Sequence, residues 1–159
     1  MDLSDEVMEH FMNLAVKESY DRPTGFYVGA VLVSDSGKII GRGHRGFLGQ
    51  TNMLMHAERM AIEDAYNKNT KGSTLFTTLE PCVQAKQNQV LSPCCSLIAR
   101  CGISTVVYGL KDSKWGAAGE GVKELERRGI SVIQYFGWND FLESIMHISR
   151  DYDNYGLYD

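Results

Sequence analysis

The stretch that decides the fold runs from residue 74 to residue 108. TLFTT (74–78) predicts a short strand, SPCCSLIARC (92–101) a helix and ISTVVY (103–108) a second strand. Strands joined through a helix pair in parallel by a crossover connection. Outward from this unit, hydrophobic periodicity and turn residues predict the element order αββαβαβαβα. The other expected elements are helices over 5–20 (with Ser4 as N-cap), 56–67, 119–128 and 139–149, and strands over 27–33, 39–41 and 130–136. This order predicts an α/β fold, a three-layer α/β/α sandwich around a five-stranded mixed, mostly parallel sheet.

Length and composition are those of one ordinary domain. The chain has 159 residues, of which 43% are hydrophobic and 23% are charged. A single core at this length buries roughly two thirds of the surface of the unfolded chain. We therefore expect one domain over residues 1–150 and an acidic, tyrosine-containing tail over 151–159. The formal net charge of −4 disfavours a protein that binds DNA or RNA through its overall charge. It does not exclude binding through a local basic patch.

The cysteines point to a metal. No segment approaches the roughly 20 apolar residues of a membrane span, and the acidic N-terminus lacks the order of a signal peptide. We therefore expect a cytoplasmic protein without membrane contact, whose thiols stay reduced. In that compartment, four cysteines within twenty positions indicate metal binding or redox chemistry. They are Cys82, Cys94, Cys95 and Cys101.

The residue types fit a catalytic zinc site, which takes three protein ligands and leaves a fourth position for water. His56 opens one predicted helix, Cys82 follows a proline, and the pair Cys94-Cys95 opens the next helix. Both helices are expected to begin at the same edge of the sheet, where open α/β sheets place their sites. Glu58 adds a carboxylate, which a hydrolytic site uses as a base and a closed structural site does not need.

Neighbouring residues leave alternatives open. Cys95 is an alternative ligand to Cys94, since adjacent helix residues point about 100° apart. Cys101 is too far along the same helix to join the site, so we expect it to pack in the core. Phe26 could stack on a flat base, and Arg45 belongs to the basic cluster that could meet a phosphate.

MHAE (55–58) with TLEPC (78–82) resembles the motifs of the cytidine-deaminase-like superfamily of zinc hydrolases. The similarity covers about residues 5–136, and the expected element order agrees with that fold. Within the superfamily, the sequence is most similar to the pyrimidine deaminase of riboflavin biosynthesis, whose two cysteines are also spread apart with a proline before the second, as in SPCC (92–95). The resemblance covers the deaminase domain alone, and no reductase domain is expected after residue 159.

The resemblance implies a site residue by residue. It implies Zn²⁺ as the cofactor, held by His56, Cys82 and Cys94, with Glu58 as the proton shuttle. The expected substrate contacts, on motif positions and nearby side chains, are Phe26, Arg45, Ala57, Pro81 and Asp112. The family's PNP-x-VG segment is TGFYVG (24–29) here, and its second PNP is replaced by SKW (113–115). These departures fall at positions where the family would contact its substrate. The resemblance therefore predicts the type of reaction better than it predicts the substrate.

The reaction expected from this resemblance is hydrolytic deamination of a pyrimidine-type heterocycle with release of ammonia. The substrate class is a small nucleotide or an aminopyrimidine like that of the riboflavin pathway. Alternatives are a deoxycytidylate, nucleoside, purine-base or tRNA-editing deaminase. An alternative of another class is a zinc-stabilised binding domain without turnover, which the altered substrate positions permit and the intact His56-Ala57-Glu58 opposes. The resemblance also implies a homo-oligomer, a dimer or a tetramer.

Overall fold

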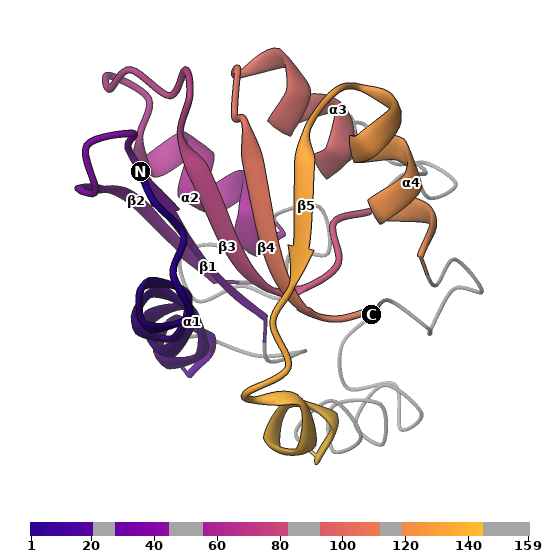
Figure 1. Ribbon diagram of the computed structural model, residues 1–159. Helices are drawn as coiled ribbons and strands as arrows, with labels where there is room; N and C mark the ends of the chain where they lie inside the picture. The colour runs from indigo at the N-terminus through magenta and orange to yellow at the C-terminus, as the bar shows by residue number, and fades with distance from the viewer. Residues whose placement is uncertain (21–27, 45–55, 83–92, 112–118, 145–159) are drawn as a thin grey trace, which may run out of the picture.

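A computed structural model describes residues 1–20, 28–44, 56–82, 93–111 and 119–144 of the chain (Figure 1). The elements follow the predicted order, and residues 139–144 form the beginning of the last predicted helix. Their bounds are α1 (Asp5–Ser19), β1 (Gly29–Val33), β2 (Ile39–His44), α2 (Ala57–Asp64), β3 (Thr74–Leu79), α3 (Cys94–Arg100), β4 (Thr105–Leu110), α4 (Glu120–Arg127) and β5 (Ser131–Gln134). The predicted strand over 130–136 is shorter than expected, and the predicted helix over 56–67 ends at Asp64. The tail over 151–159 lies outside the described residues, so the domain bounds stay a prediction.

The five strands form one mixed sheet in the order β2-β1-β3-β4-β5. β1 is antiparallel to both of its neighbours, whereas β3, β4 and β5 pair in parallel. Four strands therefore run in one direction and β1 runs against them. The prediction that strands joined through helices pair with one another holds for β3, β4 and β5. It is wrong for β2 and β3, because β1 lies between them and pairs antiparallel with both. Two of the four strand pairings are therefore antiparallel.

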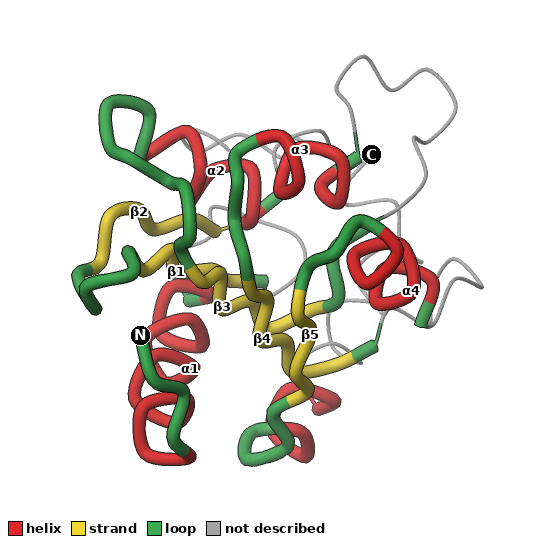
Figure 2. The backbone as a smooth tube through the Cα atoms, turned by 45° about the horizontal axis from the view of Figure 1, so that its top comes forward, coloured by secondary structure: helices red, strands yellow, loops and turns green. Residues whose placement is uncertain are grey.

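Helices cover both faces of the sheet, which confirms the three-layer architecture (Figures 1 and 2). Successive strand residues point to opposite faces, so Val31 and Val33 pack under α1 while Leu32 packs toward α2. The face under α1 buries Phe11, Met12, Ala15, Val31, Val33, Phe76 and Val107. The other face is covered by α2, α3 and α4 and includes Ala57, Ala61, Leu75, Ile98, Val106 and Leu125. No helix among the described ranges is long and apolar enough to cross a membrane.

Two glycines let α2 lie directly against β2. A Cβ atom at Gly41 would lie 3.2 Å from Ala65 Cβ and closer still to the Ala61 carbonyl. A Cβ atom at Gly43 would lie 2.8 Å from Met60 Cβ and overlap the backbone of the first turn of α2. The missing side chains on β2 therefore fix the height of α2 above the sheet.

Candidate active site

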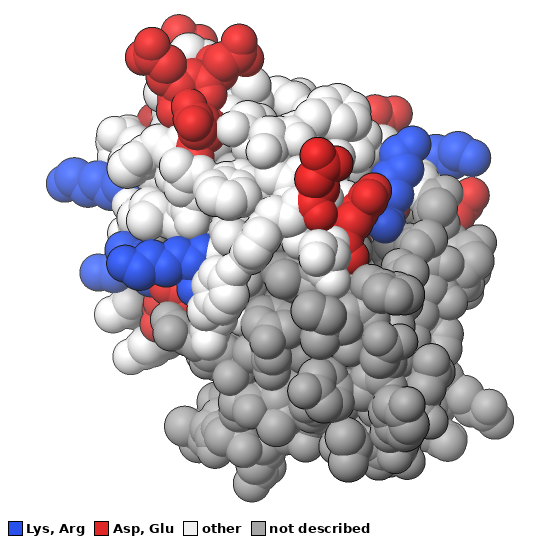
Figure 3. All heavy atoms as spheres, turned by 90° about the horizontal axis from the view of Figure 1, so that it is seen from below, with Lys and Arg blue, Asp and Glu red and all other residues white. Residues whose placement is uncertain are grey.

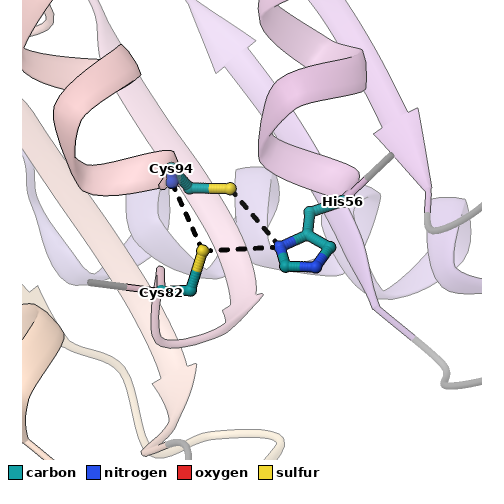
Figure 4. A group of neighbouring side chains, drawn as sticks. All are labelled: His56, Cys82 and Cys94. Carbon is teal, nitrogen blue, oxygen red and sulfur yellow. Dashed lines mark hydrogen bonds between the residues drawn. The ribbon is translucent and has the colours of Figure 1, made fainter. Parts of the chain in front are cut away.

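Three side chains from separate elements converge beyond the carboxyl end of β3 (Figure 4). His56 is the N-cap residue of α2, and Cys94 is the first residue of α3. Cys82 lies in the turn that follows β3. A ligand atom from each of these residues lies within 4.8 Å of the other two. The expectation that the two helices begin at the same edge of the sheet is confirmed by this geometry.

The three ligand atoms face one another at short range. The His56 Nδ1 atom lies 3.5 Å from the Sγ atoms of both Cys82 and Cys94. The backbone N–H of Cys94 donates to the Cys82 sulfur over 3.3 Å. One nitrogen and two sulfur donors form a set that suits Zn²⁺ in catalytic sites. The described side chains therefore fit the metal that the sequence predicts.

The two cysteines share their protons unequally. The hydrogen bond from the Cys94 thiol, against the opposing effect of burial, lowers the pKa of Cys82 to about 4. The same hydrogen bond and burial raise the pKa of Cys94 well above its usual range. These opposite shifts favour a thiolate at Cys82 over one at Cys94. A cation that binds both sulfurs must displace the Cys94 proton.

Glu58 lies beside this group in the first turn of α2. It is 3% exposed, and its Oε2 atom lies 3.7 Å from the Cys94 sulfur. Burial raises the pKa of Glu58, while the charge of His56 and the hydrogen bond from Thr77 lower it. The Thr77 hydroxyl reaches Glu58 Oε1 at 3.1 Å, and it also lies 3.0 Å from the Leu79 carbonyl. The arrangement is a buried carboxyl group, oriented by a hydroxyl, next to the three ligand atoms.

Cys95 and Cys101 have different surroundings. The Cys95 sulfur lies 3.6 Å from the Pro81 carbonyl and 3.7 Å from the Gly121 carbonyl, and the described metal-ligand group does not include it. Burial raises its pKa above the usual thiol range. Cys101 is partly buried and packs against the core under α2 and α3. The geometry thus favours Cys94 over Cys95 as the third ligand and agrees with a packing role for Cys101.

Two of the five predicted substrate contacts fall within the described residues. Ala57 and Pro81 are both buried, beside the metal-ligand group in sequence. Phe26, Arg45 and Asp112 lie outside the described residues. All five stay predictions.

Sequence reasoning missed two residues that shape the site. Thr77 is an inward-facing threonine on β3 that orients Glu58. Glu80 lies in the quoted TLEPC motif, but its partners are backbone groups some forty residues further along the chain. The available signals were local: a threonine in the strand that leads to the PC motif, and an acidic residue before Pro81.

The fold and the site together define the class of protein. The family model described as "Cytidine and deoxycytidylate deaminase zinc-binding region" matches residues 4–110. That range holds His56, Glu58, Cys82 and Cys94. The chain belongs to this family.

Curated relatives carry two different names. The riboflavin biosynthesis protein RibD of Escherichia coli is 34% identical over 125 residues, which are 79% of this chain and 32% of that protein. The tRNA-specific adenosine deaminase of Streptococcus pyogenes serotype M18 is 36% identical over 124 residues, which are 74% of this chain and 72% of that protein. The chain therefore spans about a third of the length of the riboflavin relatives it matches.

Solved structures share the fold. One is a diaminohydroxyphosphoribosylaminopyrimidine deaminase/5-amino-6-(5-phosphoribosylamino)uracil reductase from Thermotoga maritima, at 36% identity and a TM-score of 0.75. The match covers 92% of this chain and 41% of that one. The resemblance inferred from HAE and TLEPC is confirmed by these comparisons, and so is the fold class.

Proposed function

We propose that this protein is a zinc-dependent hydrolase that removes an amino group from a pyrimidine-type heterocycle and releases ammonia. The observation that carries the proposal is the convergence of His56, Cys82 and Cys94 with the buried carboxyl group of Glu58. A structural zinc site has no use for that carboxyl group. Membership of the deaminase family supports the same reaction class.

We propose that His56 Nδ1 and the sulfurs of Cys82 and Cys94 hold the metal. When bound, zinc supplies a Lewis acid that makes water nucleophilic near neutral pH. The Cys94 backbone N–H, which donates to the Cys82 sulfur, helps to hold that sulfur in place. Cys94 is buried, and His56 and Cys82 are partly buried, so electrostatic interactions among these groups are stronger than they would be in open water.

In this proposal Glu58 moves the protons. It takes one proton from the attacking water and delivers it to the ring nitrogen as the C–O bond forms, and then moves the remaining proton of the added hydroxyl to the amine, which leaves as ammonia as the C–N bond breaks. A general acid–base group works best when its pKa lies near the working pH, and burial shifts the pKa of Glu58 in that direction. Thr77 holds one carboxyl oxygen, Oε1. The other, Oε2, lies on the side of Cys94 and the metal ligands.

The proposed substrate class is a small nucleotide or an aminopyrimidine like that of the riboflavin pathway. Two names support it. The curated relatives are riboflavin biosynthesis proteins, and the Thermotoga maritima structure is named as a deaminase of an aminopyrimidine. We also propose, from the resemblance alone, that the chain forms a homo-oligomer.

A tRNA-editing deaminase is the second candidate. Its support is the Streptococcus relative, of which this chain covers 72%, against 32% for the Escherichia coli RibD protein. On the face shown in Figure 3, the described acidic and basic side chains form small separate groups rather than one extended basic patch. The formal net charge of −4 favours the small-molecule substrate, because tRNA binding depends on neutralised phosphates.

Ammonia release from a panel of compounds tests both candidates. The panel contains aminopyrimidines, cytosine nucleotides, adenine and guanine derivatives, and tRNA, and the control is zinc-loaded Glu58→Gln. We expect release from one compound class and a loss of at least about 10²-fold in the variant. Activity that depends steeply on salt would favour tRNA over a small molecule. Activity that survives in the Glu58 variant would refute the proposed role, and a zinc-loaded protein silent on the whole panel would favour a binding domain without turnover.

A further inference from the structure

Glu80 is a buried carboxylate, two residues before Cys82, that reaches the start of a helix. It is 2% exposed. Its Oε1 atom accepts a hydrogen bond from the backbone N–H of Gly119, and its Oε2 atom accepts one from Val122, both over 2.9 Å. These are the N-cap and third residues of α4, whose N–H groups have no partner within the helix. The negative charge also lies at the positive end of the α4 dipole.

The chain on either side of this carboxylate is held by its backbone. The Glu80 N–H donates to the carbonyl of Leu110 at the end of β4 over 2.8 Å. Gly121 in α4 lies so close that a Cβ atom there would be 2.9 Å from Glu80 Cγ and nearer still to the Pro81 carbonyl. The first turn of α4 therefore lies flush against the turn that leads to Cys82.

The α3 helix closes the third side of the same turn. The backbone N–H of Cys95 donates to the carbonyl of Cys82 over 3.1 Å. The Cys95 thiol lies within 3.7 Å of the carbonyls of both Pro81 and Gly121, between the turn and α4. The segment from Glu80 to Cys82 thus contacts the end of β4, the first turn of α4 and the first turn of α3.

We propose that Glu80 is a positioning residue for the metal site, which ties the turn carrying Cys82 to the N-terminus of α4 and so fixes the Cys82 sulfur before a metal arrives. The inference rests on the proposed function, because it takes Cys82 to be a metal ligand. Two residues of chain can span up to about 7 Å, so a free turn would leave this sulfur considerable latitude. Supporting groups beyond the ligands typically account for 10–100-fold in metal affinity.

A helix cap without a positioning role predicts a different outcome. Loss of a cap alone lowers the stability of the fold and leaves the metal affinity of the folded protein unchanged. Glu80→Gln distinguishes the two roles. Both carboxylate oxygens accept hydrogen bonds from backbone N–H groups, and the NH₂ group of glutamine cannot accept one in place of an oxygen. The side chain then keeps one hydrogen bond and loses the other together with the charge.

The experiment compares the wild-type chain with Glu80→Gln and with Glu120→Gln. Glu120 lies in the first turn of α4, and its side chain is 51% exposed, so this control removes the same charge away from the turn. Zn²⁺ affinity is measured by chelator competition, and the Co²⁺-loaded proteins are compared by their d–d and thiolate-to-cobalt absorption bands. We expect Glu80→Gln to bind Zn²⁺ about tenfold or more weakly with altered cobalt bands, and the control to match the wild type.

Several results overturn the inference. One such result is a folded Glu80→Gln variant that binds Zn²⁺ with wild-type affinity and gives an unchanged cobalt spectrum. Glu80 would then act only as a helix cap. If Glu80→Gln does not fold, Gly121→Ala keeps the carboxylate and presses on the Pro81 carbonyl, and wild-type Zn²⁺ affinity in that variant would contradict the inference equally. A wild-type chain that binds no Zn²⁺ would instead refute the proposed function from which the inference starts.

Discussion

Replacing Gly43 with alanine should displace the helix that carries Glu58. The new methyl group would lie 2.8 Å from Met60 Cβ and closer still to the Ala57 carbonyl and the Ala61 nitrogen. Ordinary contact begins at 3.4 Å, so the Met60 contact alone requires a shift of 0.6 Å (3.4 − 2.8), and the closer backbone atoms require α2 to move further from β2. The obstruction is backbone in the first turn of α2, which no change of rotamer can relieve.

The expected cost has two parts. Overpacking of this kind typically lowers the free energy of unfolding by about 1–3 kcal/mol, and a backbone obstruction places Gly43→Ala in the upper half of that range. A misplacement of about 1 Å at a catalytic group can cost about 10²-fold in rate. For a shift of this order we expect a loss of about 10- to 100-fold in ammonia release, together with weaker Zn²⁺ binding. Urea unfolding followed by circular dichroism and chelator competition measure the two parts.

Gly41→Ala is the matched control. Its methyl group would press on Ala61, in the second half of α2, and on the C-cap residue Ala65, both further from the metal ligands than the first turn. We expect a comparable loss of stability and a smaller loss of Zn²⁺ affinity. Wild-type stability and affinity in Gly43→Ala would show that the contact between α2 and β2 does not set the position of the site.

Three further predictions concern the side chains of the site. Cys94→Ser should abolish tight Zn²⁺ binding while Cys95→Ser retains it, as measured by metal content after dialysis; the reverse result would make Cys95 the ligand. Because the pKa of Cys94 is raised well above its usual range and that of Cys82 is lowered to about 4, metal binding should displace chiefly one thiol proton. Zn²⁺ affinity should then rise about tenfold per pH unit between about pH 7 and 9, and a pH-independent chelator competition would contradict that. Thr77→Val removes a hydrogen bond that lowers the pKa of Glu58, so the acid limb of the pH–rate profile should move to higher pH; an unmoved limb would remove Glu58 from that titration.

Local signals were sufficient for the order of the elements and for grouping the candidate metal ligands. Ser4 caps α1 through a hydrogen bond from the Val7 N–H, as the sequence predicted. His56, Cys82 and the pair Cys94-Cys95 could be grouped in advance because the first and the pair open helices and Cys82 follows a strand; the choice of Cys94 over Cys95 came from the family resemblance. Elements that begin or end at the same edge of a sheet bring such residues together whatever the rest of the chain does.

The tertiary structure alone decided how those pieces are joined and supported. β1 lies between β2 and β3, a matter of strand pairing that no local pattern encodes. Glu80 meets Val122, which is 42 residues away, and Thr77 meets Glu58, which is 19 residues away. The sequence determines on which element a polar residue lies, but the tertiary packing determines its hydrogen-bond partner. A buried carboxylate must find hydrogen-bond donors, and only the assembled sheet and helices determine which donors lie within reach.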